Sequence, residues 1–185
     1  MQRKDKQKQD EEAEKMTDFA KTMDQAVKVM ADREGKYLTF SLAGEEYGIG
    51  IRKIKEIIGM MTITTVPQTP LYCKGVINLR GKVIPVVDLR LKFNMEEMAY
   101  TDRTCIIVME LHTNAGNVLM GIVVDAVSEV LNVKAADIEE TPSFGAAMKT
   151  DYILGMAKAG NGIKILLDID KVMSDQEIAI LHEAA

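Results

Sequence analysis

Few side chains in this sequence could carry out catalysis near neutral pH. His112 and His182 are the only imidazoles, and neither belongs to an HExxH or Cys-His arrangement. Four aspartates could in principle form a carboxylate site for acid–base chemistry: Asp88, Asp125, Asp168 and Asp170. However, Asp88 and Asp168 follow apolar strands at equivalent places, which favours capping of a turn for both. The sequence gives no catalytic constellation.

The glycine-rich stretches do not match the motifs that bind nucleotide phosphates. A P-loop requires a Ser or Thr hydroxyl directly after Gly-Lys to bind magnesium, but Val83 follows Gly81-Lys82. The Gly-x-Gly pairs at 48–50 and 160–162 lack the third glycine of a dinucleotide-binding fingerprint. We therefore expect no cofactor, no metal and no enzymatic activity, and the sequence favours a role in recognition.

The composition is typical of a soluble globular protein, with 185 residues of which 47% are hydrophobic and 28% charged. No stretch approaches the roughly 18 consecutive apolar residues that a membrane span needs. The N-terminus lacks the apolar core of a signal peptide. Cys73 and Cys105 stand alone, without a CxxC motif or histidine partners. We expect reduced thiols in the cytoplasm.

The net charge of −5 is unevenly distributed. Residues 1–36 carry nine basic and nine acidic side chains, which cancel, so the remaining residues hold the whole net charge. A mildly acidic body is a poor electrostatic match for nucleic acid or anionic lipid. We therefore expect neither nucleic-acid binding nor direct membrane insertion.

Residues 1–35 form a charged N-terminal extension that differs from the rest of the chain. The first part, residues 2–15, is expected to be disordered. Beyond it, apolar residues recur at the three- and four-residue intervals of an amphipathic helix: Met16, Phe19, Ala20, Met23, Ala26, Val27 and Met30. This stripe is either one side of a solvated helix or a surface that packs against the body or another chain.

From about residue 36 to residue 172 the sequence predicts short strands. The runs 104–109 and 118–124 are near-continuously apolar and rich in β-branched residues, with a hairpin at 113–117 between them. Asn161-Gly162 is a strong hairpin signal between 153–158 and 163–167. The chain then ends in a helix, for which Ser174 and Glu177 form a capping box.

The strand region resembles itself. The pattern GIxIxxIxEI at 48–57 returns 73 residues later as GIxVxxVxEV at 121–130. Gly75 and Asp88 return 80 residues later as Gly155 and Asp168, although Ile84 corresponds to a lysine. Two related β-halves of about five short strands fit this spacing. Each half is too small to bury a stable core alone, so we expect a shared seam, which is a usual place for a binding groove.

The stretch VPQTPLYCKGVINLRGKVIPVVDLRLKF at 66–93 strongly resembles the chemotaxis coupling protein (CheW) family. The pattern in this chain is Pro-x-x-Pro, Gly-x-x-Asn-Leu-Arg-Gly and Ile-Pro-x-x-Asp-Leu-Arg. Further matches are EEYGIGIRKIKEIIG (45–59), GIVVDAVSEVL (121–131) and LLDIDKVM (166–173). The resemblance covers about residues 37–180, and its several ordered motifs make it more specific than any single signature.

The resemblance implies a mostly β fold with two SH3-like five-stranded β-barrel subdomains and a groove between them. An N-terminal helical extension (1–35) and a C-terminal helix would complete it, with 36–185 forming the CheW-like domain. Family members join the cytoplasmic tips of methyl-accepting chemoreceptors to the regulatory domain of the histidine kinase CheA. The resemblance therefore implies a cytoplasmic adaptor, associated with membrane-bound receptor arrays, that acts without catalysis or cofactor.

The resemblance also implies particular site residues. The receptor-contact positions of the family fall on Ile54, Glu56, Arg80, Cys105 and Val130. Pattern alone leaves Ile54 and Val130 equally compatible with core positions. Many members carry a basic residue where this chain has Ile58, which speaks against a charge-based contact there.

Five further residues are expected to be structural and to serve turns: Gly75, Gly81, Asp88, Gly121 and Gly155. One alternative function stays open, a CheW-like scaffold or dimerisation module of another two-component system, with the 16–30 helix making the contact. A hydrolase built on the strand-end aspartates is a third alternative.

Overall fold

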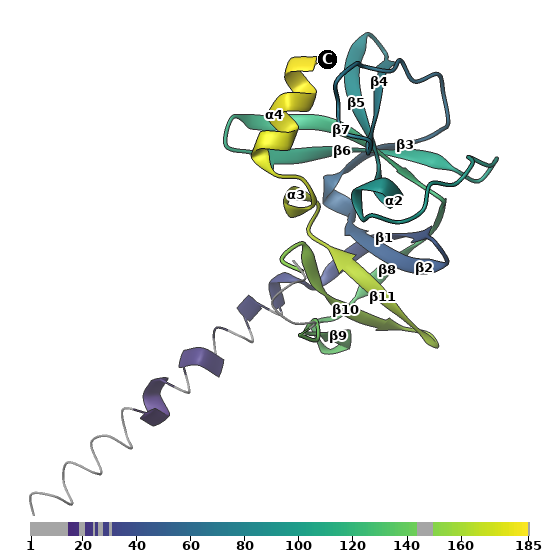
Figure 1. The fold of residues 1–185 in the computed structure, drawn as a ribbon. Helices are drawn as coiled ribbons and strands as arrows, with labels where there is room; N and C mark the ends of the chain where they lie inside the picture. The colour runs from purple at the N-terminus through teal and green to yellow at the C-terminus, as the bar shows by residue number, and fades with distance from the viewer. Residues whose placement is uncertain are drawn as a thin grey trace, which may run out of the picture.

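The structure of the chain is mostly β, as the sequence predicts. The computed structural model describes residues 15–18, 21–23, 25, 28–29, 31–143 and 150–184. Its described strands form two sheets that lie side by side, with β3–β7 in the upper part of Figure 1 and the others below. The described residues between 15 and 32 are helical and lead away from both sheets.

The first barrel is the five-stranded sheet with the order β3-β6-β7-β5-β4. Its strands are β3 (Ile54–Gly59), β4 (Cys73–Leu79), β5 (Lys82–Asp88), β6 (Cys105–Thr113) and β7 (Gly116–Val124). Neighbouring strands run antiparallel except β5 and β7, which run parallel. The hairpin predicted around residues 113–117 is confirmed, because Thr113 pairs with Gly116 at the end of β6 and β7.

The second barrel has the strand order β8-β1-β2-β11-β10-β9. Its strands are β1 (Gly35–Leu42), β2 (Glu45–Gly50), β8 (Ala126–Val133), β9 (Ile138–Glu139), β10 (Ile153–Ala159) and β11 (Gly162–Leu167). The sixth strand, β9, has only two residues, so this barrel is a five-stranded sheet with a short addition. Here β2 and β11 are the parallel pair.

The described helical elements of the body are short; four of them follow strands, and α4 follows α3. They are η1 (Ile51–Lys53), α2 (Leu89–Lys92), η2 (Ala135–Asp137), α3 (Ile169–Val172) and α4 (Asp175–Ala184). Asp88 caps α2, because its Oδ1 accepts hydrogen bonds from the backbone N–H groups of Arg90 and Leu91 at 3.0 and 3.3 Å. Asp168, at the equivalent place before α3, makes no such side-chain cap.

The capping box at the start of α4 is confirmed. The Ser174 hydroxyl accepts from the Glu177 N–H at 3.2 Å, and the Glu177 carboxylate accepts from the Ser174 N–H at 2.8 Å. This reciprocal pair satisfies two backbone donors that a helix N-terminus would otherwise leave unpaired. The predicted C-terminal helix therefore begins directly after Ser174, the first residue of the capping box.

The two barrels do not coincide with the two sequence repeats. The first repeat contains β1–β5 and the second contains β6–β11, yet β1 and β2 lie in the second barrel, and β6 and β7 lie in the first. Each repeat thus gives its first hairpin to the barrel that the other repeat completes. The repeated pattern at 48–57 and 121–130 spans the two points where the chain crosses between barrels.

Equivalent contacts confirm the internal duplication in three dimensions. Asp88 donates its N–H to the Tyr72 carbonyl at 2.7 Å, and Asp168 donates to the Tyr152 carbonyl at the same distance. Both tyrosines and both aspartates are 80 residues apart, as the sequence repeat requires. The two halves therefore build the same strand-end geometry twice.

The largest hydrophobic cluster lies between the barrels and not inside either one. Among the described residues it contains twenty buried side chains, drawn from both sheets and from α2, α3 and α4. The separate clusters formed by Ile77, Ile84 and neighbours, and by Tyr37, Leu166 and neighbours, contain only six and five. Because hydrophobic stabilisation grows with buried apolar area, the shared cluster holds the molecule together. The expected seam is thus largely a packed core.

Three of the predicted turn glycines lie inside strands. Gly75, Gly121 and Gly155 belong to β4, β7 and β10, so their assignment to turns is wrong. A Cβ on Gly75 would stand 2.0 Å from the Thr64 carbonyl oxygen, and one on Gly121 would stand 2.8 Å from the Ile106 Cγ2. At Gly75 and Gly121 a glycine is needed because neighbouring groups approach the backbone closely, and not because the chain turns there. Gly81, with φ of 84°, does lie in a turn.

Candidate protein-binding site

Strand β3 presents its side chains in an unusual order. The exposure of its residues alternates, but Glu56 lies on the half-buried side and Ile57 on the open side, where it is 44% exposed. A carboxylate on the inner side of a strand needs a partner, since burying an unpaired charge costs free energy. A large apolar side chain left in solvent suits a surface that another protein covers.

The partner of Glu56 is Arg80, at the tip of the β4–β5 hairpin. The Arg80 Nη2 donates to the Glu56 Oε1 at 2.7 Å. Arg80 and Gly81 form a two-residue loop with φ angles of 53° and 84°, the sign pattern of a type I′ turn. The Gly81 N–H donates to the Asn78 Oδ1 at 2.8 Å, which closes the loop.

These residues border a shallow groove of about 650 Å³ on the first barrel. A second ion pair, Lys55 to Glu110 at 3.1 Å, lies on the same groove. Apolar side chains from four strands line it as well: Leu79, Ile84, Val108 and Leu119. The groove therefore combines apolar lining with charges of both signs, a combination that suits a protein surface better than a small anion.

The equivalent hairpin of the second barrel lacks the ion pair. Its loop uses Gly160, with φ of 59°, at the place of Arg80. Lys158 occupies the position of Asn78 in the strand register and pairs with Glu139 instead. The pseudo-symmetry of the fold is broken at this point, so only the first barrel carries an arginine at the hairpin tip.

The remaining predicted contact residues are not gathered in one place. Ile54 and Cys105 are partly buried against the shared core, on paired strands of the first barrel. Burial raises the pKa of the Cys105 thiol, against a smaller opposing effect of its hydrogen bond to the Val127 backbone. Val130 is 50% exposed on β8 of the second barrel. The structure pairs the side chains of Glu56 and Arg80, whereas Ile54 and Cys105 pack against the shared core and Val130 lies on the other sheet.

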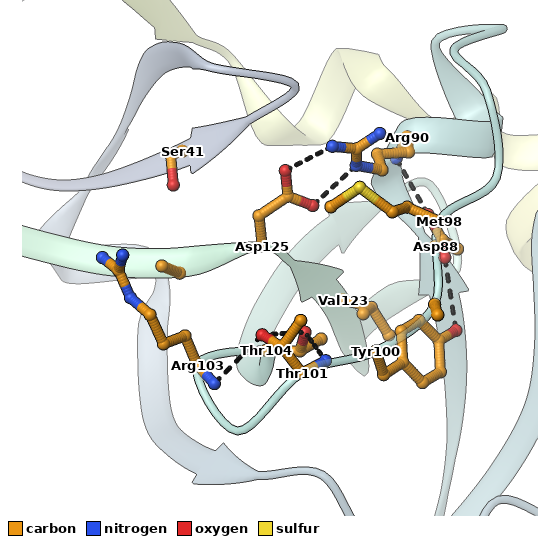
Figure 2. A pocket seen from close by; sticks show the side chains of 12 residues that line it. Ser41, Asp88, Arg90, Met98, Tyr100, Thr101, Arg103, Thr104, Val123 and Asp125 are labelled. Carbon is orange, nitrogen blue, oxygen red and sulfur yellow. Dashed lines mark hydrogen bonds and ion pairs between the residues drawn. The ribbon is translucent and has the colours of Figure 1, made fainter.

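An ion pair that the sequence motifs did not single out lies where the chain crosses from β7 to β8. Arg90 donates from Nε and Nη2 to the two carboxylate oxygens of Asp125, at 2.6 and 2.7 Å (Figure 2). Asp125 also accepts from the Ala43 N–H of the second barrel at 2.8 Å. Burial acts to raise the pKa of Asp125, but these hydrogen bonds together outweigh it and lower the pKa.

A cavity of about 270 Å³ adjoins this pair, under the segment 98–104 (Figure 2). On its wall the Tyr100 hydroxyl donates to Asp88 Oδ2 at 3.2 Å. Desolvation, followed by the charge of Asp88, raises the pKa of this phenol. The carboxylates of Asp88 and Asp125 thus both accept hydrogen bonds from neighbouring protein groups.

A second crossover pair is the counterpart of the first with reversed polarity. Lys53, in η1 where the chain crosses from β2 to β3, pairs with Asp170 of α3. Asp170 also accepts from the His112 N–H at 2.9 Å, and the Lys53 ammonium lies 3.0 Å from the His112 Nδ1. His112 is thus part of a structural contact, while the side chain of His182 lies outside the described residues. Each of the two crossings therefore has its own ion pair between a basic side chain and an aspartate.

No group of three or more metal-binding side chains occurs among the residues that the structure describes. Within the same residues, no helix has the length and apolar character needed to cross a membrane. The apolar stripe of the extension is only partly described, because Phe19, Ala20, Ala26, Val27 and Met30 lie outside the described residues, as do residues 1–14. Met16 and Met23 are exposed.

Comparison with known proteins identifies relatives across most of the chain. A family model described as a CheW-like domain matches residues 36–177. The chemotaxis protein CheW of Klebsiella aerogenes is 41% identical over 150 residues, which cover 81% of this chain and 88% of that protein. The chemotaxis protein CheW of Bacillus subtilis is 34% identical over 142 residues, covering 76% and 88%.

A solved structure shares the fold. It is the scaffolding protein TtCheW from Thermoanaerobacter tengcongensis. The match has a TM-score of 0.69 and 32% sequence identity, and it covers 78% of this chain and 97% of that one. The N-terminal extension, residues 1–35, precedes the part that the family model matches.

Proposed function

The chain belongs to the CheW family, and from that premise we propose that it is a chemotaxis adaptor. It couples the cytoplasmic tips of methyl-accepting chemoreceptors to the regulatory domain of the histidine kinase CheA. It does so by protein–protein binding alone, without catalysis or a cofactor. The proposal places it in the cytoplasm, associated with membrane-bound receptor arrays, with residues 36–185 as the CheW-like domain.

The ion pair between Glu56 and Arg80 is the observation that carries the receptor contact. The Arg80 side chain is 77% exposed and that of Glu56 is 28% exposed. Exposed pairs of this kind contribute only about 0–1 kcal/mol to folding, so stability alone gives little reason for it. An oriented pair beside an apolar groove is well suited to fix the register of a helical receptor tip.

The apolar part of the receptor contact is provided by Leu79 and Leu119, the partly buried apolar side chains of the groove. A receptor helix would lay an apolar stripe against these side chains, as amphipathic helices do in hydrophobic grooves. In this proposal Ile54, Cys105 and Val130 extend the contact. Ile54 and Cys105 support it from beneath, since both pack against the shared core, and Val130 presents an exposed face on β8.

The kinase contact requires a second surface, which we place on the second barrel. Ile163, the second residue of β11, is among the most exposed large apolar side chains of the body. Its equivalent in the first barrel is Val83, the second residue of β5, which is also exposed. An adaptor needs two separate contacts, and individually weak contacts gain strength when several act together in an array.

Charge reversal tests the receptor contact. Arg80→Glu and Glu56→Lys are each expected to weaken binding of a purified receptor-tip fragment at least about tenfold, the loss typical of a disrupted interface charge. The melting temperature is expected to stay nearly unchanged, because the pair is exposed. Lys158→Glu, in the exposed pair of the second barrel, is the matched control and should leave receptor binding intact. Equal loss of folding and binding would show that Glu56 and Arg80 are structural.

The kinase contact has its own test. Ile163→Asp is expected to weaken capture of the CheA regulatory domain while leaving the receptor tip bound. Loss of both partners, or of neither, would contradict two separate surfaces.

A further inference from the structure

The backbone at the tip of the β4–β5 hairpin is strained for the residue that occupies it. Arg80 has φ of 53°, in the left-handed region that side chains with a Cβ seldom adopt. The equivalent residue of the other repeat is Gly160, with φ of 59°, which adopts this conformation without steric cost. Glycine would therefore serve the hairpin better than arginine, so the arginine is retained for its side chain.

The same hairpin contains a side-chain acceptor that its counterpart lacks. Asn78 Oδ1 accepts the Gly81 N–H at 2.8 Å across the loop. The corresponding Lys158 directs its ammonium to Glu139 instead. A side-chain amide that accepts a backbone N–H in this way holds a turn in one conformation. The hydrogen bond from Gly81 to Asn78 therefore restrains the hairpin in which Arg80 has its strained backbone.

The restraint acts on the direction of the Arg80 side chain. Arg80 lies between Asn78 and Gly81 in the sequence, so the hydrogen bond between those two residues limits rotation of the Arg80 backbone. With its backbone fixed, Arg80 extends across the sheet to Glu56, with 2.7 Å between donor and acceptor. A long side chain that is already ordered loses less conformational entropy when a partner binds.

We propose that Asn78 is a positioning residue for receptor recognition. It holds the Arg80–Gly81 turn so that the Arg80 guanidinium is directed over Glu56 before the receptor arrives. This inference rests on the proposed receptor contact, and it assigns Asn78 no contact with the receptor itself. It also makes recognition one-sided, because the second barrel has neither the arginine nor the amide.

The test is a double-mutant cycle with a purified receptor-tip fragment as the probe and the full-length chain as the protein. Asn78→Leu, which removes the acceptor, is expected to weaken binding about fivefold, the equivalent of one hydrogen bond. Asn78→Asp keeps an acceptor oxygen and is expected to bind within about twofold of the original chain. In an Arg80→Ala background, Asn78→Leu is expected to cause no further loss, because Asn78 acts through Arg80.

Several outcomes would overturn the inference. Unchanged binding by Asn78→Leu, where Arg80→Ala does weaken binding, would show that the turn needs no positioning. Further loss in the double mutant would show that Asn78 acts independently of Arg80. If Asn78→Leu fails to fold, Asn78→Ala takes its place in the cycle. Unchanged binding by Arg80→Ala would instead contradict the proposed receptor contact, so the two failures are distinguishable.

Discussion

Arg90 and Asp125 form a two-bond ion pair that ties α2 of the first barrel to the crossing between β7 and β8. The pair is mostly buried, with side-chain exposures of 12% and 22%. Because Asp125 also accepts from Ala43 of the second barrel, this one carboxylate connects the two sheets. The shared hydrophobic core holds the barrels together, and the ion pair adds a polar link between them.

Removing one member of this pair is expected to destabilise the protein. Arg90→Leu leaves Asp125 partly buried without its main partner, and breaking such pairs costs about 2–4 kcal/mol. Urea unfolding gives the free energy directly. The matched control is Lys158→Leu, from the exposed pair with Glu139, which should cost less than about 1 kcal/mol. Similar losses for the two variants would mean that the crossover pair has no special role.

Glu177 makes stability depend on acidity. Burial alone would raise its pKa, but the combined hydrogen bonds from Lys92, Tyr72 and Ser174 lower it from 4.5 to about 2. The folded state therefore keeps the carboxylate charged at acidities where the unfolded chain takes up a proton. This contribution to stability is complete above about pH 4.5 and is lost as the pH falls towards 2.

The Glu177→Gln variant tests this dependence. Urea unfolding between pH 6 and pH 3 is expected to show a shallower loss of stability in the variant than in the original chain. The same carboxylate also caps α4, so the variant should be less stable at neutral pH as well. Parallel pH profiles for the two proteins would show that Glu177 does not hold its low pKa.

Arg80→Gly separates folding from recognition. Glycine relieves the left-handed strain but loses a weak ion pair, so the melting temperature is expected to stay the same or rise slightly. Receptor-tip affinity should fall at the same time, at least about tenfold, since the guanidinium is gone. Calorimetry and a binding titration on one preparation measure both. A marked fall in melting temperature would identify Arg80 as a structural residue.

Features that depend on neighbours in the sequence could be predicted from it. The hairpin at 113–116, the Asp88 cap and the Ser174–Glu177 capping box all involve residues within three positions of each other. The family motifs also indicated Glu56 and Arg80. They did not reveal that the two side chains contact each other, because that depends on how β3 and the β4–β5 hairpin curve within one sheet.

Features that depend on long-range pairing could not be predicted. The repeats suggested two consecutive halves, but strand pairing exchanges the hairpins β1–β2 and β6–β7 between the barrels. The pairs Arg90–Asp125 and Lys53–Asp170 escaped notice for the same reason. The sequence does contain one relevant feature: Arg90 and Asp170 are equivalent under the 80-residue offset and have opposite charges. Each of these two residues forms the ion pair at one crossing between the barrels.

Gly75 offers the sharpest test of the corrected glycine assignments. A Cβ at this position would meet the Thr64 carbonyl oxygen at 2.0 Å, and φ of 132° is itself unfavourable for alanine. Gly75→Ala is therefore expected to cost at least about 3 kcal/mol, because the backbone around Thr64 must move. Gly81→Ala is the matched control, since its φ of 84° is also positive but nothing lies within 4 Å of its Cβ. It should cost about 1 kcal/mol, the strain term alone.

Urea unfolding of the two glycine variants separates steric clash from backbone strain. The difference between their free energies of unfolding measures the close approach of the Thr64 carbonyl in the first barrel. A Cβ on the equivalent Gly155 would lie 2.7 Å from the Ile138 Cγ2 and 2.8 Å from the Glu139 carbonyl oxygen, so Gly155→Ala should fall between the other two. A Gly75→Ala variant as stable as Gly81→Ala would mean that the 60–72 segment yields freely and does not need the glycine.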